Sequence, residues 1–179
     1  MTALVISEHD NSELKGATLN TISAALQLDE EIHVLVAGSN CNTVAESAAK
    51  ANGVSKVLYV DSPEYENFLA ENISLLIKNL SGDYSSILAP ATTNGKNYMP
   101  RVAAFLDVAQ ISDISSVESN DTFQRPIYAG NCIATVTSSD DVKVITVRTT
   151  AFDPVPSDSG SAEIVKLEEI NDAGISQFI

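Results

Sequence analysis

Cysteine, basic residues and long apolar runs are scarce in this sequence, and each scarcity argues against a class of protein. The 179 residues include two cysteines, Cys41 and Cys132, which stand far apart and outside any CxxC pattern. Neither a zinc site nor a disulfide framework is therefore indicated, and both thiols are expected to be reduced and structural. No run approaches the roughly 20 apolar residues of a membrane-spanning helix, so no membrane insertion is expected.

Basic residues are few and acidic residues are abundant. Ten lysines and arginines stand against 24 acids, which gives a formal net charge of −14 and a pI near 4.3. Nucleic-acid binding relies on clustered Lys and Arg, and no such cluster occurs, so no nucleic-acid partner is expected. The first residues, MTALVISEHD, lack the basic segment of a signal peptide. These features favour the cytoplasm or an equivalent reducing compartment.

The first 110 residues alternate short β-branched runs with helical patterns. The apolar runs end in polar residues or glycine, as strands buried on both faces do. Between them, apolar residues recur every three or four positions, which marks one face of a helix. Strands are predicted at 3–7, 31–38, 55–62 and 84–90, and helical stripes at 19–26, 40–52, 68–80 and 99–106.

After residue 110 the pattern changes to strands alone. Polar turns such as Asn120-Asp121 and Asp140-Asp141 separate the apolar stretches 111–119, 122–130, 132–139 and 142–150. Consecutive antiparallel pairing is the economical interpretation. The predicted fold class is α/β, a three-layer Rossmann-like βαβ domain with a parallel sheet extended by antiparallel strands after residue 110.

The last segment is acidic and rich in proline, serine and glycine. It carries six acids and one lysine between residues 152 and 179. We expect an α/β domain over residues 1–152, followed at 153–179 by a linker with one short edge strand, AEIVKLEE, at 162–169.

The stretch ILAPATTNGKNYMPRV, residues 87–102, has the order of parts that holds a phosphate: a strand, a glycine-lysine loop and a helix. A Walker A loop needs a glycine five residues before Gly95 and a hydroxyl after Lys96. Here Pro90 and Asn97 occupy those two positions. The loop is therefore interpreted as part of a docking surface rather than as a phosphate cradle.

Other nucleotide-binding patterns are weak as well. Gly16 and Gly38 follow the first two strands as lone glycines, without the GxGxxG spacing. A stand-alone adenine-nucleotide module of universal-stress type stays open as an alternative because of the βαβ pattern. No glycine lies between Gly95 and Gly130, where that type of loop would need its second pair.

All three arginines and two lysines, Lys96, Arg101, Arg125, Lys143 and Arg148, lie between residues 96 and 148. An anion or an acidic partner is expected to dock on that half of the chain. Lys96 and Arg101 fit an anion near the start of a helix, where free N–H groups and the helix dipole favour negative charge.

A simpler interpretation of those two residues is a solvated Lys96 and an Arg101 paired with an acid such as Asp107. Pro100 is tolerated so close to the helix start if Asn97 caps the helix, because N–H groups of the first turn have no intrahelical partner.

The two histidines are the remaining candidates for chemistry. His9 lies between Glu8 and Asp10, which could orient it for base catalysis in a hydrolase. No nucleophile motif accompanies it, so a structural histidine at a strand end is favoured. His33 sits in an apolar strand and is assigned to the core. We predict no catalytic residue and no metal site.

Four stretches of this chain resemble a known family. They are LVISEHDNSELKGATLNTISAA near the start, GKNYMPRVAAFLDVAQISDI in the middle, RPIYAGNCIATV at 125–136 and VKVITVRTTAFD at 142–153. In that order they resemble the amino-terminal domain of the alpha subunit of electron-transfer flavoproteins. The combination of GKNxxPRxA, ISDI and IYAGN is specific, and the resemblance covers essentially the whole chain.

The resemblance implies an electron carrier rather than an enzyme. Its heterodimer of alpha and beta subunits carries electrons on FAD from flavin dehydrogenases, including those of fatty acid β-oxidation, to a quinone oxidoreductase. In the family a flavodoxin-like domain supplies most FAD contacts and contains an Arg-Pro-Glu-Leu turn and a Ser-Gly-Gly-Arg-Gly loop. Neither motif occurs here. We therefore expect FAD in the full heterodimer and none on this chain alone, in a bacterial cytoplasm or a mitochondrial matrix.

The resemblance also assigns the glycine-lysine loop and the YAGN stretch to packing against the beta subunit and supporting the flavin domain. In the family the beta subunit has a similar domain that holds AMP, whereas the alpha domain is not known as a nucleotide site. The candidate interface residues are Gly95, Lys96, Asn97, Arg101, Arg125, Tyr128, Gly130 and Asn131.

Overall fold

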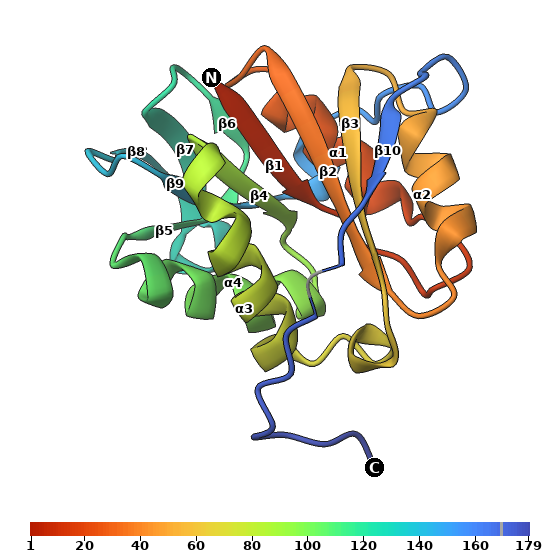
Figure 1. Cartoon of the computed structure of the whole chain (residues 1–179). Helices are drawn as coiled ribbons and strands as arrows, with labels where there is room; N and C mark the ends of the chain where they lie inside the picture. The colour runs from red at the N-terminus through yellow and green to blue at the C-terminus, as the bar shows by residue number, and fades with distance from the viewer. Residues whose placement is uncertain (169) are drawn as a thin grey trace.

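Seven parallel strands form the central sheet of the protein (Figure 1). The computed structural model describes residues 1–168 and 170–179. The strand order is β10-β3-β2-β1-β4-β9-β5. The bounds are β1 Thr2–Ile6, β2 Glu31–Gly38, β3 Val54–Asp61, β4 Ser86–Pro90, β5 Gln110–Ile114, β9 Lys143–Val147 and β10 Glu163–Lys166.

Helices cover both faces of this sheet, so the domain has three layers. The α-helices are α1 Gly16–Ala25, α2 Asn42–Ala49, α3 Ala70–Leu80 and α4 Thr93–Leu106. Short 3-10 turns occur at η1 Pro63–Tyr65, η2 Ser81–Asp83, η3 Tyr128–Gly130 and η4 Thr149–Ala151. In Figure 1, α3 and α4 lie in front of the sheet and α1 behind it.

The protein has two hydrophobic cores, one on each face of the central sheet, because the side chains of each strand alternate between the two faces. Ala3 and Val5 of β1 pack with α1 and α2, whereas Leu4 and Ile6 pack with α3 and α4. Successive side chains of a strand point to opposite faces, so a strand covered on both faces must be apolar at every position. The predicted α/β class with a parallel sheet is confirmed.

A second, small sheet is antiparallel and consists of β6 Ser116–Val117, β7 Thr122–Ile127 and β8 Cys132–Thr137. Phe123 of β7 is fully buried and joins the core on the α1 and α2 side of the central sheet. The antiparallel strands predicted after residue 110 are thus present, as a separate sheet packed beside the central one.

Two strands pair differently from the sequence-based expectation, since β5, at the start of the predicted stretch 111–119, is parallel to β9 rather than antiparallel to the strand after it. We expected residues 142–150 to pair antiparallel with the strand before them, but β9 lies between β4 and β5 and is parallel to both. The physical reason is its composition: Val144, Ile145 and Val147 are fully buried, which a solvent-exposed hairpin could not provide. Burial on both faces is typical of an interior strand of a parallel sheet.

The predicted edge strand near the carboxyl end of the sequence is confirmed as β10, which pairs parallel with β3. Before it, the chain runs over α1 and α2: the Val155 amide donates to Leu19 and the Gly160 amide to the Lys50 carbonyl. Residue 169, the last of the predicted AEIVKLEE strand, lies outside the described residues. The division into a domain at 1–152 and a linker at 153–179 stays a prediction.

Helix α4 approaches the end of β4 very closely. A Cβ atom at Gly95 would lie 2.0 Å from the carbonyl oxygen of Pro90. The Thr92 hydroxyl caps the helix by accepting the Gly95 amide at 3.4 Å. The expectation that Asn97 caps this helix was wrong, because the helix begins at Thr93, one turn earlier than the apolar stripe indicates. Pro100 therefore lies inside the helix, at an exposed position.

The contact at Gly95 generates a stability prediction. Gly95→Ala should lower the free energy of unfolding by more than about 2 kcal/mol, since the added methyl group overlaps backbone that cannot move without shifting the strand. The matched control is Gly16→Ala, at the start of α1, where a Cβ atom meets nothing within 4 Å. Urea unfolding of both variants measures the difference, and equal stabilities would contradict this account.

Candidate functional site

β1 and β4 are neighbours in the central sheet. The connection after β1 leads to β2 on one side, and the connection after β4 leads to β5 on the other. In sheets of this type ligands usually bind in the crevice at the carboxyl ends of two such strands. Two side chains face each other there. The Thr92 hydroxyl, at the first turn of α4, donates to the Glu8 carboxylate at 2.6 Å. The Glu8 amide in turn donates to the hydroxyl of Thr18 in α1, at 2.9 Å. This crevice is thus occupied by a carboxylate of the protein itself.

This arrangement does not fit a nucleotide or flavin diphosphate. A phosphate at the start of α4 would meet the negative charge of Glu8, and the glycine of the loop is packed against Pro90 rather than open to a ligand. Phosphate cradles need free backbone N–H groups and room for the anion. The structure therefore explains Gly95 as a packing residue.

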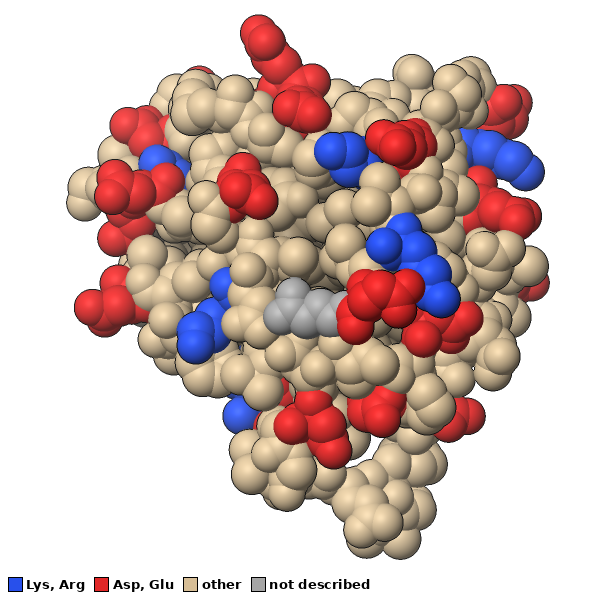
Figure 2. Space-filling model, viewed as in Figure 1, with Lys and Arg blue, Asp and Glu red and all other residues tan. Residues whose placement is uncertain are grey.

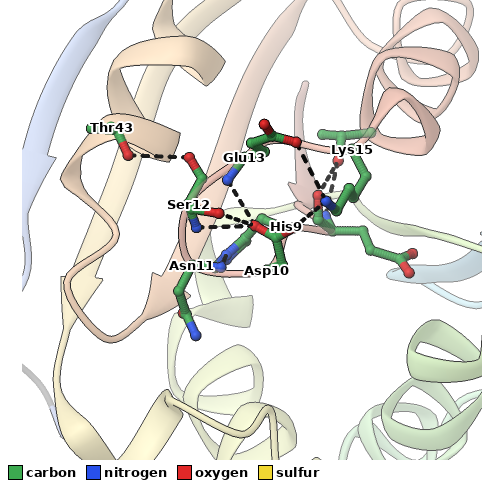
Figure 3. A network of polar contacts seen from close by, with 9 residues as sticks. His9, Asp10, Asn11, Ser12, Glu13, Lys15 and Thr43 are labelled. Atoms are coloured by element: carbon green, nitrogen blue, oxygen red, sulfur yellow. Dashed lines mark hydrogen bonds and ion pairs between the residues drawn. The ribbon is translucent and has the colours of Figure 1, made fainter.

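The loop after β1 contains a dense polar network (Figure 3). One oxygen of Asp10 accepts the Ser12 amide at 3.1 Å, the Ser12 hydroxyl at 2.6 Å and the Glu13 amide at 2.8 Å. Its other oxygen pairs with Lys15, and this pairing together with the Ser12 and Glu13 bonds holds the pKa of Asp10 well below its usual range. Hydrogen bonds to the ionised form lower a carboxyl pKa. The Asp10 carboxylate thus stabilises the turn.

His9 is buried beneath this loop, with 5% of its surface exposed. Its Nδ1 accepts the Asn11 amide at 3.1 Å, and its ring meets the edge of Phe68 at a centroid distance of 5.0 Å. Burial lowers the pKa of His9 to about 4. The apolar cavity beside it, which Ile6 and Tyr98 also line, has room for about one water molecule. This geometry favours the structural role over a hydrolase base.

His33 lies in β2 as predicted, but at its partly exposed start. Its Nδ1 is 2.9 Å from the Tyr84 hydroxyl, and its Nε2 is 3.1 Å from the Glu31 carboxylate. Both ring nitrogens therefore have partners in the fold.

The predicted interface residues divide into two groups. The first group is on α4, where Gly95 is buried and Lys96, Asn97 and Arg101 are exposed. Arg101 forms an ion pair with Glu71 of α3 at 2.7 Å, not with Asp107 as the sequence suggested. Asp107 instead ends the helix in a left-handed conformation, with φ of 55°.

The second group is on the hairpin of β7 and β8. Arg125 is in β7, while Tyr128, Gly130 and Asn131 form the turn. Tyr128, Ala129 and Gly130 have positive φ values of 49°, 53° and 89°. A left-handed residue other than glycine costs roughly 1–2 kcal/mol. This strained turn holds Tyr128 in solvent, 78% exposed.

The structure does not bring these two groups together into one surface. Helix α4 packs in the core on the α3 side of the central sheet, whereas β7 packs through Phe123 in the core on the α1 and α2 side. They are two separate candidate surfaces, which we call the α4 surface (Lys96, Asn97, Arg101) and the hairpin surface (Tyr128, Gly130, Asn131).

Sequence reasoning missed one exposed apolar residue of the hairpin. Ile133 in β8 is 58% exposed and pairs in register with Pro126. The available signal was an apolar residue on the outward face of an otherwise amphipathic strand. With Ile133 the hairpin surface has two large, exposed hydrophobic side chains.

Negative charge is spread widely over the molecule. Figure 2 shows acidic side chains across the whole face in view, with several of the few basic ones beside an acid. Of the ten Lys and Arg residues, Lys15, Arg101 and Arg148 form ion pairs with acids among the described residues. An excess of acids on the surface therefore does not by itself give every basic group an acidic partner.

The buried His9 makes stability depend on pH. The unfolded chain binds the His9 proton at a pKa near 6.5 and the folded chain only at about 4, so the free energy of unfolding falls as pH drops from 6.5 to 4. At about 1.36 kcal/mol per pKa unit, the loss is roughly 3 kcal/mol.

The check is urea unfolding at pH 7.5 and 4.5 for the protein and for His9→Asn, which removes the titrating ring. The carboxylates common to both proteins cancel in the comparison. We expect the variant to lose about 2–3 kcal/mol less than the parent over this range, and an equal loss would show that His9 is not the group responsible.

A model of the electron transfer flavoprotein domain matches residues 3–172. The chain is 59% identical over 179 residues to the electron transfer flavoprotein subunit alpha of Pseudomonas aeruginosa, covering all of this chain and 58% of that protein. It is 52% identical over 176 residues to the mitochondrial alpha subunit of Dictyostelium discoideum, covering 94% of this chain and 50% of that protein.

A third relative is the alpha subunit of Paracoccus denitrificans, 44% identical over 180 residues. The chain thus spans 50–58% of the length of these three relatives. These matches lend no support to the universal-stress alternative. Within residues 1–168 and 170–179, no helix is long and apolar enough to cross a bilayer.

The match over almost the whole chain and the α/β architecture agree with the motifs GKNxxPRxA, ISDI and IYAGN. The chain belongs to the electron transfer flavoprotein domain family.

Proposed function

We propose that this chain is the subunit-binding part of an electron transfer flavoprotein alpha subunit and performs no chemistry of its own. The observation that carries the proposal is the 59% identity to such a subunit over the entire chain. The complete complex with a beta subunit would carry electrons on FAD. Flavin dehydrogenases, including those of fatty acid oxidation, would donate the electrons, and a membrane quinone oxidoreductase would accept them.

The hairpin surface is the side we assign to the beta subunit. Tyr128 and Ile133 expose 78% and 58% of their surfaces, and aromatic and apolar groups are enriched at the centres of protein interfaces. The strained turn at Tyr128 and Ala129 adds to this argument, because backbone strain persists where a rigid presentation of side chains serves a function.

We assign the α4 surface to the flavin-binding domain that the family resemblance implies. Its cations lie near the carboxyl ends of the strands, and Arg101 is already neutralised by Glu71. A surface whose arginine is already paired within the chain suits a contact that forms and breaks, as contacts between domains of one chain commonly do. The domain at 1–152 would then be joined to the flavin domain through the acidic segment 153–179.

The cofactor proposal follows from the crevice between β1 and β4. Because Glu8 and the packed Gly95 do not fit a diphosphate, FAD would draw its phosphate contacts from outside the described residues. The compartment would be the cytoplasm in a bacterium or the mitochondrial matrix in a eukaryote.

Loss of apolar contacts at the hairpin surface should weaken the heterodimer. We expect Tyr128→Ala and Ile133→Ser each to weaken binding of the beta subunit about tenfold or more, as truncation of a central interface residue does. Calorimetry or biolayer interferometry measures this. The matched control is Phe105→Ser on α4, 47% exposed, which should change the affinity less than about twofold.

The opposite result, a loss at Phe105 and none at Tyr128, would assign the beta subunit to the α4 side. It would leave the family assignment intact.

The chain by itself should not retain flavin. After incubation with excess FAD and gel filtration, we expect no absorbance at about 450 nm in the protein peak, because a flavoprotein is coloured only where the protein holds the cofactor. Stoichiometric flavin in that peak would contradict the proposal that the phosphate contacts lie elsewhere. The control is the same treatment of the complete heterodimer, which should be yellow.

A further inference from the structure

Arg125 is the one arginine of the three that has no acidic partner among the described residues. Arg101 pairs with Glu71 at 2.7 Å, and Arg148 pairs with Asp113 at 2.6 Å. For Arg125 the structure shows no ion pair or side-chain hydrogen bond within residues 1–168 and 170–179, and its Nε is buried without a partner. A buried polar atom without a hydrogen-bond partner, such as this Nε, needs an explanation.

Arg125 lies on the inner face of the small sheet. It is two residues from the fully buried Phe123 in β7, so both side chains point to the same side, toward the central sheet. Opposite Arg125 in the register is the small residue Ala134 of β8, which leaves room beside the guanidinium group. The side chain is therefore directed between the two sheets rather than into open solvent.

A groove of about 310 Å³ opens at this position. One wall belongs to β5, an edge strand of the central sheet, through Gln110 and Ile111. The other wall is the end of β8 and the turn after it, through Val136 and Ser139. The volume lies at the lower end of the range of roughly 300–1,000 Å³ that is usual for ligand sites.

The acid on the groove wall does not neutralise Arg125. Asp140 uses its Oδ2 to accept the Ala109 amide at 3.0 Å and the Ser138 hydroxyl at 3.1 Å, while its own carbonyl accepts from Lys143 at 2.8 Å. These bonds fasten the turn after β8 to the loop before β5. The carboxylate therefore shapes the groove, and no ion pair joins it to Arg125 among the described residues.

We infer that this groove receives a carboxylate-bearing segment of the beta subunit, which Arg125 binds through its guanidinium group. The planar fork of Arg matches a carboxylate in two parallel hydrogen bonds. The polar residues Thr137, Ser138 and Ser139 also line this groove. The inference rests on the proposed function, since it names the chemistry by which the partner is recognised.

A protein segment fits this site better than a free anion. A small anion in the groove would be attracted by one cation, Arg125, and repelled by Asp140 on the same wall. A protein segment would also be held by contacts outside the groove. Such contacts are at hand, because the strands β7 and β8 that form the groove also carry Tyr128 and Ile133 of the hairpin. The groove and the hairpin surface are thus parts of the same small sheet.

The test is the affinity of the full-length alpha subunit for the beta subunit, measured by calorimetry. Arg125→Gln should weaken binding roughly ten- to a hundredfold, as loss of a hydrogen-bonded interfacial charge does. Arg125→Lys should restore only part of the affinity, because an ammonium group cannot form the paired contact. Arg148→Gln, at an arginine already paired with Asp113 and outside the candidate interface residues, is the matched control and should change the affinity less than about twofold.

Thermal unfolding of the alpha subunit alone separates recognition from folding. Since Arg125 has no acidic partner in the described part of the chain, Arg125→Gln should not lower the melting temperature. A marked decrease would show that Arg125 acts within the fold and would overturn the inference.

Two binding outcomes are distinguishable. Tight binding of the parent subunit with unchanged affinity of Arg125→Gln would overturn the role of Arg125 and leave the proposed function standing. Failure of the parent subunit to bind any beta subunit would overturn the proposed function and, with it, this inference.

Discussion

The close approach of α4 to the end of β4, with no room for a side chain at Gly95, determines what the carboxyl edge of the central sheet can do. The first turn of α4 packs against the Pro90 carbonyl, and the hydroxyl of its cap residue Thr92 donates to the Glu8 carboxylate. The Gly95 amide, one of the N–H groups that could otherwise attract a phosphate at this position, donates to the Thr92 hydroxyl. The crevice that serves related folds as a ligand site is here a packed junction between β1, β4 and α4.

With that crevice closed, the features that point to a partner lie on the small antiparallel sheet. Its turn is strained, its outer face exposes Tyr128 and Ile133, and its inner face carries Arg125 without a partner in the described chain. The small sheet is held by a few residues such as Phe123, so the rest of its surface is free for recognition. A rigid core with recognition elements at its edge is a common division of labour in folded domains.

Local patterns predicted most elements of the fold. Strands such as 31–38 could be predicted because they are short, nearly continuous apolar runs, and the helix at 68–80 because its apolar residues follow a period of 3.6. The pairing of β9 could not be predicted from the sequence. The hydrogen-bonded neighbours of a strand depend on which other strands of the sheet still have an unpaired edge beside it. The predicted start of α4 was too late for a related reason. Residues Thr93 to Asn97 are polar and show no apolar helical pattern, but the close packing of Gly95 makes a helical turn favourable there.

The sequence by itself determined the α/β class, the family, and the lack of a phosphate loop, because each depends on residue types at fixed spacings along one stretch of chain. Only the tertiary structure decided which charged groups are paired. The partner of Arg101 lies 30 residues away in Glu71, and Arg125 has none in the described residues. Charge pairing depends on distances between separate elements, and these distances exist only after the two cores have packed.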